Sequence, residues 1–246
     1  MIQVNSSSPE SIKEDTDLAG VLEDRRSMYT FLARIYEREV TTEFLKELSS
    51  KESPLQTTSI VDMDEDEFKE GFMELTSYLK NMQDANLDEE KLKLDVEYAN
   101  LFLSVLVRIH PSESSYTTRE HLVYDEPRQE VFEIYVREGV EKIAEFTEPE
   151  DHIAIEMQFM AYLCRKAIEA NEQQNWESML GLLKTQEDFV RKHLMNWTPK
   201  LTKNIIEKSN TGFYRGAAKI TNAFLEVESD SIKELKAYVS AKRSSV

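Results

Sequence analysis

EFTEPEDHIAIEMQFMAYL, residues 145–163, sets a threonine, a proline, several acids and a histidine directly before an apolar pattern with helical spacing. In its second half, apolar residues recur every three or four positions, which predicts a helix with one face in a core. Thr147 and Glu150 fit a capping box, and Pro149 is tolerated in a first helical turn. Helix initiation does not explain His152, because the positive end of a helix dipole disfavours an imidazolium.

The same apolar spacing continues along most of the chain. Only six glycines and six prolines interrupt 246 residues. This predicts an all-α protein, a single bundle-like domain of about ten helices. We expect residues 1–16 to be a disordered tail and residues 17–246 to form the helical domain. Residues 108–132 hold two prolines and no sustained period, so we expect a long irregular connection, with a hinge over about residues 108–152, between N- and C-terminal portions.

Several residues predict where individual helices begin and end. Pro127 suits a first helical turn, and Gly139 suits the left-handed conformation that ends the same helix. Residues 198–199 are typical of a new helix start, and Ser231 with Glu234 fits a capping box for a last helix. An earlier helix is expected to bury one apolar stripe, made of Leu92, Val96, Ala99, Leu103 and Leu106.

The chain is strongly acidic. With 30 Lys and Arg against 47 Asp and Glu, its formal net charge is −17, which disfavours nucleic acid and anionic lipid and favours cationic partners. No apolar run approaches the ~20 residues that span a membrane, so stable membrane insertion is not expected. The first residues lack the basic and apolar regions of an export signal, which favours a cytoplasmic location. The single cysteine, Cys164, excludes an internal disulfide and is predicted to be a small buried hydrophobe.

The sequence carries no signature of an enzyme. It lacks GxSxG, CxxC, GxGxxG, GxxxxGK[ST] and HExxH, so we expect no catalytic residues. His152 and Glu156 share a helix face, but two ligands are fewer than the three or four of a zinc site, and no metal or other cofactor is expected. The remaining histidines lie far off in the sequence: His110, His121 and His193. PSESSY, residues 111–116, is typical of a turn whose serines bond to nearby backbone.

Six segments occur in a recognisable order. They are EYANLF (97–102), PSESSY (111–116), EPRQEVFEIYVREG (126–139), EPEDHIAIEMQFMAYL (148–163), HLMNW (193–197) and GFYRGAAKITNAFL (212–225). In this order and at these separations they resemble the TorD/DmsD family of redox-enzyme maturation chaperones. The most specific element is E-P-x-D-H followed by E-x-x-F-M, at residues 148–160. The first ninety residues match only in being amphipathic helices.

The resemblance implies a helical, non-enzymatic, cytoplasmic chaperone. Its client would be the catalytic subunit of a molybdopterin oxidoreductase of the dimethyl-sulfoxide-reductase type. Such chaperones bind the twin-arginine leader of that subunit, hold it back from export and assist while the molybdenum cofactor is inserted. The implied partners are therefore this leader and the apo catalytic subunit. Both a monomer and a domain-swapped dimer are compatible with the resemblance.

The same match assigns leader binding to the E-P-x-D-H segment. The implied peptide-binding residues are Glu148, Pro149, Asp151 and His152, with Glu113, Ser114 and Tyr116 as neighbours. Carboxylates suit guanidinium groups, so we expect Asp151 and Glu148 to pair with arginine while His152 orients one of them or bonds to peptide backbone. Two other functions stay open: a helical interaction scaffold without leader binding, and a weak GTP-binding or GTP-hydrolysing protein. The missing phosphate-binding glycines argue against the second.

Overall fold

The computed structural model describes residues 18–50, 53, 55, 65–83, 85–104, 109–118 and 126–244. Their regular secondary structure is helical apart from one isolated β-bridge, which confirms the all-α prediction. The α-helices and two π-helical segments (η) are α1 (Leu18–Glu37), α2 (Thr42–Leu48), α4 (Asp66–Gln83), α5 (Leu87–Tyr98), η2 (Ala99–Leu103), α6 (Ser114–Thr117), α7 (Glu126–Arg137), α8 (Ile153–Glu172), α9 (Trp176–Phe189), η3 (Val190–Leu194), α10 (Met195–Lys208) and α11 (Gly212–Ser244). No helix among the described residues is long and apolar enough to span a membrane. The tail predicted at residues 1–16 lies outside the described residues.

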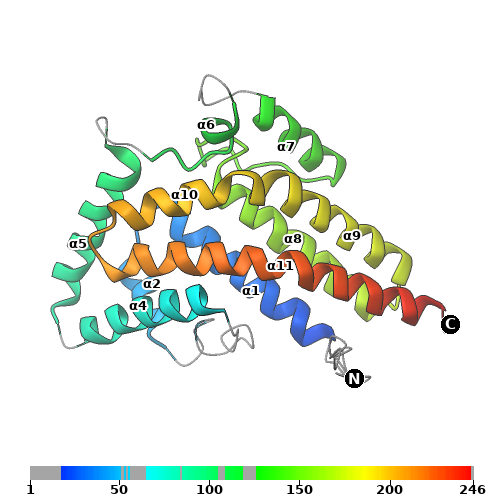
Figure 1. Cartoon of the computed structure of the whole chain (residues 1–246), viewed down its shortest axis with the longest axis horizontal. Helices are drawn as coiled ribbons and strands as arrows, with labels where there is room; N and C mark the ends of the chain where they lie inside the picture. Colours follow the sequence, from blue (N-terminus) through cyan, green and yellow to red (C-terminus); the bar gives the residue numbers. More distant parts are fainter. Residues whose placement is uncertain are drawn as a thin grey trace, which may run out of the picture.

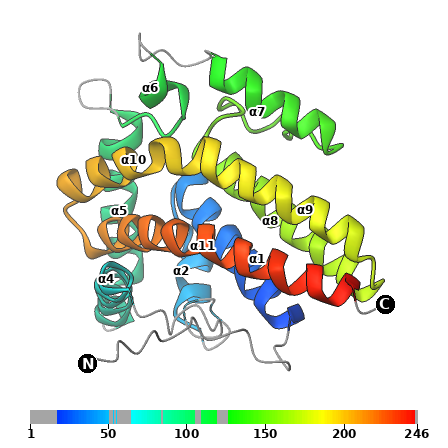
Figure 2. The same ribbon diagram turned by 45° about the vertical axis from the view of Figure 1, so that its right-hand side comes forward.

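The long helices pack side by side in pairs (Figure 1). The most extensive contacts are those of α1 with α8 and of α4 with α11. α9 packs on both α8 and α11, and α10 packs on α11. Helices α1, α8, α9 and α11 therefore surround a common interior. α6 and α7 lie at one edge of the molecule, as the turned view in Figure 2 also shows.

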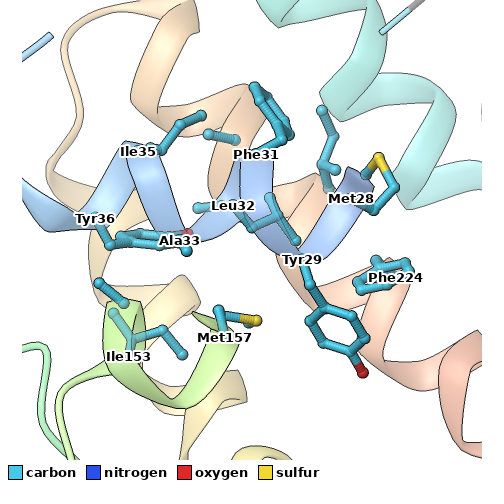
Figure 3. Packing of buried hydrophobic residues seen from close by; sticks show 14 of the residues in the cluster. Met28, Tyr29, Phe31, Leu32, Ala33, Ile35, Tyr36, Ile153, Met157 and Phe224 are labelled. Carbon is cyan, nitrogen blue, oxygen red and sulfur yellow. The ribbon is translucent and has the colours of Figure 1, made fainter. Parts of the chain in front are cut away.

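The buried face of α1 shows what holds α8 in place. Tyr29 and Leu32 are both fully buried. In Figure 3 this face meets Ile153 and Met157 at the start of α8, and Phe224 of α11. The rings of Tyr29 and Phe224 meet edge to face with centroids 5.0 Å apart, the geometry that aromatic quadrupoles favour. Because truncating a buried leucine costs about 2–5 kcal/mol, this face fixes the first turns of α8 firmly.

α4 and α11 approach each other closely at a pair of glycines. A Cβ atom added at Gly71 would lie 2.7 Å from the backbone oxygen of Gly216, and one added at Gly216 would lie 2.6 Å from the backbone oxygen of Gly71. Such contacts are shorter than any side chain tolerates, and a backbone oxygen cannot move aside without moving its helix. The two glycines therefore set the distance between α4 and α11.

The helix boundaries confirm some predictions and overturn others. Pro127 lies in the first turn of α7, and Gly139 follows the end of that helix with φ 72°, both as predicted. The other two predicted starts are wrong, because Pro199 lies inside α10 and residues 231–234 lie in the middle of α11. α11 stays unbroken because its buried face continues past that point through Ile232, and tertiary packing outweighs a local capping pattern.

The apolar stripe predicted for α5 and η2 is wrong within the described residues, and its last member, Leu106, lies outside them. Leu92, Val96 and Leu103 are each more than half exposed. The residues that this segment buries are Leu94, Glu97, Tyr98, Leu101 and Phe102. Oε1 of Glu97 accepts hydrogen bonds from the backbone N–H groups of Asn210 (2.6 Å) and Thr211 (3.0 Å). This contact holds the face of α5 that carries Glu97 toward the protein interior. The spacing of apolar residues did not predict that this face is the buried one.

Candidate functional site

Two segments that lie far apart in the sequence meet in a short antiparallel contact. Ser112 and His152 form an isolated β-bridge. Two backbone hydrogen bonds flank it, from Glu113 N–H to the carbonyl of Asp151 (2.9 Å) and from Ile153 N–H to the carbonyl of Pro111 (2.8 Å). The structure thus brings together residues 111–116 and residues 148–152, the two segments that the resemblance had singled out.

His152 starts helix α8. Its Nδ1 accepts a hydrogen bond from the backbone N–H of Ala154 at 3.1 Å, so the imidazole is the N-cap of the helix. A ring that accepts at Nδ1 is neutral and carries its proton at Nε2, which removes the conflict with the helix dipole. The capping box predicted at Thr147 and Glu150 is wrong. Residues 148–152 contact residues 111–116, and α8 begins at Ile153, after this contact in the sequence.

The buried Asp151 side chain links residues 148–152 to residues 111–116. It is fully buried, and its Oδ2 accepts a hydrogen bond from the backbone N–H of Ser114 at 2.8 Å. Burial raises the pKa of the Asp151 carboxyl, although the bond from Ser114 works in the opposite direction. In this conformation the Asp151 carboxylate does not reach the surface, so it cannot meet an arginine of a partner there.

Three buried carboxyls gather behind this contact. We call Glu113, Asp151 and Glu156, with His193 and Trp197, the carboxyl cluster. Oε2 of Glu156 accepts a hydrogen bond from Nε1–H of Trp197 at 3.2 Å, while its Oε1 meets no donor among the described residues. Burial first, and then the neighbouring Glu113 and Asp151, raise the pKa of Glu156 well above its ordinary value. Glu156 therefore keeps its proton to a higher pH, and once protonated it can donate a hydrogen bond to Glu113.

His193 reaches the carboxyl cluster from the π-helical segment η3. Its Nδ1 lies 2.9 Å from Oε2 of Glu113, and both side chains are 3% exposed. Spacing along the sequence gave no reason to place His193 near Glu113. The available signal was the pair His193 and Trp197 in HLMNW, since residues four apart share a helix face. π-helical turns are frequent at functional sites, and η3 here aims His193 at residues 111–116.

The remaining predicted residues lie around the same contact. Pro149 is buried, and Glu148 and Tyr116 are half-buried. The Tyr116 ring packs on Trp197 with centroids 5.5 Å apart. Of the predicted peptide-binding carboxylates, Glu148 is therefore the one nearest to solvent, whereas Asp151 and Glu113 lie inside.

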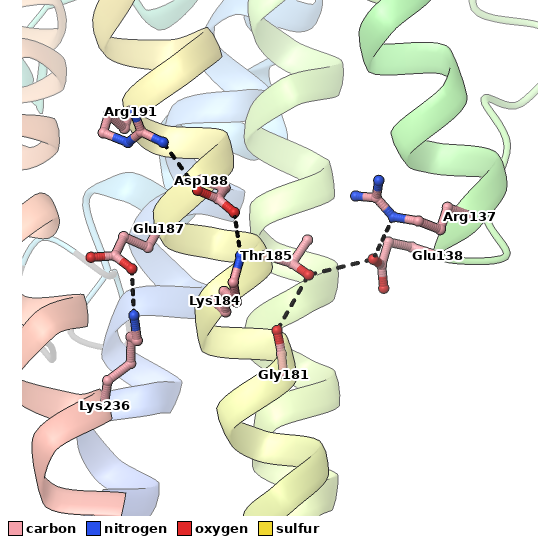
Figure 4. Close-up of polar contacts among 9 residues, drawn as sticks. All are labelled: Arg137, Glu138, Gly181, Lys184, Thr185, Glu187, Asp188, Arg191 and Lys236. Atoms are coloured by element: carbon pink, nitrogen blue, oxygen red, sulfur yellow. Dashed lines mark hydrogen bonds and ion pairs between the residues drawn. The ribbon is translucent and has the colours of Figure 1, made fainter. Parts of the chain in front are cut away.

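The connection between α7 and α8, residues 138–152, is held at both ends. At its start, Thr185 of α9 donates a hydrogen bond to Glu138 at 3.4 Å (Figure 4). Toward its end, Glu150 pairs with Arg128 of α7, and Nζ of Lys142 lies 3.8 Å from Oε1 of Glu150. Burial by itself would raise the pKa of Glu150. The hydrogen bond and charge of Arg128 and the charge of Lys142 lower it by more, so the net shift is downward. The basic groups of this region are thus paired within the protein.

No metal-binding arrangement accompanies the His152 and Glu156 pair. Across the described part of the chain, no group of three or more His, Cys, Asp and Glu side chains has the geometry to hold a metal ion. His152 uses Nδ1 as a helix cap, and Glu156 points to Trp197 instead. The arrangement offers hydrogen bonding and charge.

Comparison with known proteins gives one consistent answer. The family model described as nitrate reductase delta subunit matches residues 64–203, more than half of the chain. The chain is similar to the chaperone protein TorD of Vibrio cholerae serotype O1, with 28% identity over 214 residues that cover 87% of this chain and 94% of that one. It is also similar to TorD of Photobacterium profundum, with 29% identity over 84% of this chain and 93% of that protein. For TorD of Aliivibrio fischeri the identity is 26%, over 86% and 96%.

Proposed function

The chain belongs to the nitrate reductase delta subunit family as a TorD-type redox-enzyme maturation chaperone, and from this premise we propose its client and its mode of binding. The client is the catalytic subunit of a molybdopterin oxidoreductase of the dimethyl-sulfoxide-reductase type. The chaperone binds the twin-arginine leader of that subunit and assists cofactor insertion before export, which places it in the cytoplasm. Its relatives are chaperones, which argues against the GTP-hydrolysing alternative.

One observation carries the proposed binding mode. Residues 111–116 and 148–152 are the segments that resemble the leader-binding motifs of the family, and they lie against each other through the Ser112–His152 bridge. Two motifs that are separate in the sequence would form one recognition surface in this way. The proposed peptide-binding set is Glu148, Pro149, Asp151 and His152, together with Glu113, Ser114 and Tyr116.

The charge of this region suits a basic leader. Residues 138–151 contain six acids and one lysine, and that lysine, Lys142, is directed at Glu150 and at the backbone carbonyl of Glu148. Guanidinium groups form paired, charge-assisted hydrogen bonds with carboxylates. The overall charge of −17 would speed the encounter with a basic peptide and make binding sensitive to salt.

Within this proposal the two acidic residues of E-P-x-D-H differ in their tasks. Glu148 is partly exposed and is suited to meet a guanidinium directly. Asp151 is buried and acts through Ser114, whose backbone N–H it binds, so it positions residues 111–116. His152 sets where α8 begins and so fixes the end of the connection.

Calorimetric titration of the full chain with a synthetic twin-arginine leader tests the proposal. The same leader with Lys-Lys in place of Arg-Arg is titrated in parallel, at low and at moderate salt. We expect saturable binding that weakens with Lys-Lys and with salt, because exposed charges are screened over ~8 Å at physiological ionic strength. If no leader of any candidate client binds, the scaffold interpretation replaces this one.

An Asp151→Asn variant tests the positioning role within the same titration. The carboxamide oxygen can still accept the hydrogen bond from Ser114 N–H, so we expect the circular-dichroism spectrum to be unchanged. Leader binding should weaken by about 1 kcal/mol, because a neutral amide oxygen accepts the bond from Ser114 N–H less strongly than a carboxylate does and so holds residues 111–116 less firmly. The matched control is Glu172→Asn, at an exposed position near the end of α8. Unchanged affinity with an unchanged spectrum would remove Asp151 from the site.

A further inference from the structure

An apolar pocket of about 220 Å³ lies beside the proposed peptide-binding segment. It is enclosed by the end of α1, by α7, by the connection from α7 to α8, and by α8. Its lining residues are Glu37, Tyr135, Val140, Glu141, Lys142, Ile143, Phe146, Ile155, Gln158, Phe159 and Tyr162. The volume is below the roughly 300–1,000 Å³ of typical small-molecule sites, so the pocket suits apolar side chains of a larger partner better than a whole small ligand.

The walls of the pocket present hydrocarbon surface. The rings of Tyr135 and Phe159 are 4.7 Å apart, and those of Phe159 and Tyr162 are stacked at 6.4 Å. Both tyrosine hydroxyls are used elsewhere, because Tyr135 donates to the carbonyl of Glu150 (3.2 Å) and Tyr162 to the carbonyl of Glu138 (3.3 Å). Their polar ends therefore do not need to be satisfied inside the pocket. The tyrosine rings are also held in fixed orientations, which limits the entropy lost when a partner binds.

The rim of the pocket is acidic. Glu141 is exposed, and the Glu37 side chain is 20% exposed. The cation at the rim, Lys142, donates to the backbone carbonyl of Glu148. Its charge is thus engaged within the connection itself. Oε1 of Glu37 lies 3.7 Å from Nε of Arg38, whereas Glu141 is the exposed carboxylate of the lining. An apolar pocket with carboxylates at its mouth complements a segment that carries a guanidinium next to an apolar residue.

Ile143 adds an unusual apolar exposure at the same place. Its side chain is 67% exposed although it lines the pocket. An exposed large apolar side chain that continues an apolar pocket is typical of a surface that a partner covers. The pocket also borders the peptide-binding segment directly, because Phe146 of the lining contacts the His152 ring edge to face at 5.4 Å.

We propose that this pocket binds an apolar side chain of the leader that lies next to its arginine pair, while Glu141 accepts hydrogen bonds from a guanidinium group. The inference rests on the proposed function and names the part of the surface that the leader occupies. Ile143 covers the bound apolar residue from outside. Glu148, at the far end of the connection, extends the acidic surface along the peptide.

Fluorescence anisotropy with the full chain tests this site. The probe is a labelled synthetic peptide with an Arg-Arg pair followed by an apolar stretch of leucine and alanine. We expect Ile143→Ser to weaken binding about tenfold, since it removes most of the apolar contact at the mouth. Glu141→Gln should weaken binding about threefold, as one exposed charge pair is lost.

Two matched variants control for exposure and charge. Met73→Ser removes an equally exposed apolar side chain (65%) from α4, and Glu145→Gln removes an exposed acid from the same connection outside the pocket lining. Both should bind as the unaltered protein does. With a peptide whose apolar stretch is replaced by serine, Ile143→Ser should have no further effect on binding, because that peptide makes no apolar contact with Ile143.

The outcomes separate this inference from the proposed function. If the unaltered protein binds the peptide, but Ile143→Ser and Glu141→Gln behave like their controls, the pocket is not the site and leader binding stands. If the unaltered protein binds no arginine-containing leader, the proposed function fails and the inference fails with it. Weakening in both pocket variants, absent in both controls, supports the pocket.

Discussion

Two buried polar clusters in this protein are built on opposite principles. The ion-pair cluster, Arg25 with Gln186 and Glu228, joins α1, α9 and α11 in the interior. Nε of Arg25 donates to both carboxylate oxygens of Glu228, at 2.8 and 3.0 Å, and Nη2 donates to Glu228 and to Gln186, each at 2.6 Å. The carboxyl cluster instead gathers three acids around one histidine, one indole N–H and one backbone N–H.

The two clusters differ in how their buried charges are compensated. In the ion-pair cluster, opposite charges neutralise each other; burial alone would lower the pKa of Arg25, but Glu228 raises it to a net upward shift. In the carboxyl cluster, burial and the neighbouring acids disfavour a further negative charge, so the pKa of Glu156 is raised well above its ordinary value.

The two clusters are therefore expected to differ in how they respond to pH. The ion-pair cluster lies between helices of the interior, away from residues 111–116 and 148–152. The carboxyl cluster lies directly behind those segments, and the raised pKa of its Glu156 depends on the neighbouring Glu113 and Asp151. We therefore expect the first cluster to set global stability and the second to set how stability varies with pH.

The largest effect is expected when the ion pair is broken from one side. Glu228→Leu leaves the Arg25 guanidinium buried without its counter-charge, which should cost about 3–5 kcal/mol of unfolding free energy. Urea unfolding at pH 7 measures it. The double variant Arg25→Met with Glu228→Leu should recover most of the loss, because no buried charge remains. A single variant that loses less than about 1 kcal/mol would show that Arg25 finds another partner.

A smaller loss is expected for Trp197→Phe. The indole N–H that donates to Glu156 is removed, and the carboxyl is left without that donor in a buried site, at a cost of about 1–3 kcal/mol. The hydrogen bond from Trp197 also lowers the pKa of Glu156, so the variant should hold the proton to a still higher pH. The control is Trp176→Phe at the start of α9, the other tryptophan of the chain. Equal losses in both variants would mean that ring volume alone matters.

The pH dependence of stability distinguishes the two clusters directly. A carboxyl whose folded pKa is raised binds its proton more tightly in the folded state, so its stabilising effect is complete below the ordinary pKa of 4.5 and is lost as the pH rises toward the folded pKa. Glu156→Gln mimics the protonated form at every pH. We expect the unfolding free energies of variant and unaltered protein to agree well below pH 4.5 and to diverge in favour of the variant as the pH rises above it, by at most about 1.4 kcal/mol per pH unit.

Urea unfolding from pH 5 to pH 8 gives these profiles, and their difference cancels the other titrating groups. Glu172→Gln, at an exposed position in α8, should give a profile parallel to that of the unaltered protein. Glu228→Leu should shift the whole profile downward. Parallel profiles for Glu156→Gln and the unaltered protein would contradict a raised pKa of Glu156 in the folded protein.

The smallest effect is expected for an ion pair on the surface. Lys184 pairs with Asp188 on α9 at 2.9 Å, as Figure 4 shows, but its side chain is 70% exposed. Lys184→Ala should change the unfolding free energy by no more than about 0.5 kcal/mol, and less at high salt. A loss above about 1 kcal/mol would contradict the view that burial, and not pairing alone, makes the ion-pair cluster strong.

Residues that act through local backbone geometry were predictable. Pro127 and Gly139 mark the ends of α7 as expected, because a fixed φ and a tolerated positive φ are properties of the residue itself. His152 was recognised as unexplained by helix initiation, but not as the N-cap, since histidine is not among the common capping residues. The predicted capping box failed because the backbone of residues 148–152 is engaged with residues 111–116.

The sequence by itself determined the helical class, the acidity and the six recognisable segments, because spacing, composition and motif identity are local properties. Only the tertiary structure decided which faces are buried, as the exposed Leu92 and Val96 show, and that His193 and Glu113 are partners. Whether α11 breaks at residue 231 depends on what its next turns pack against. The physical reason is the same in each case: burial and charge pairing depend on distances between segments, and one-dimensional spacing does not contain those distances.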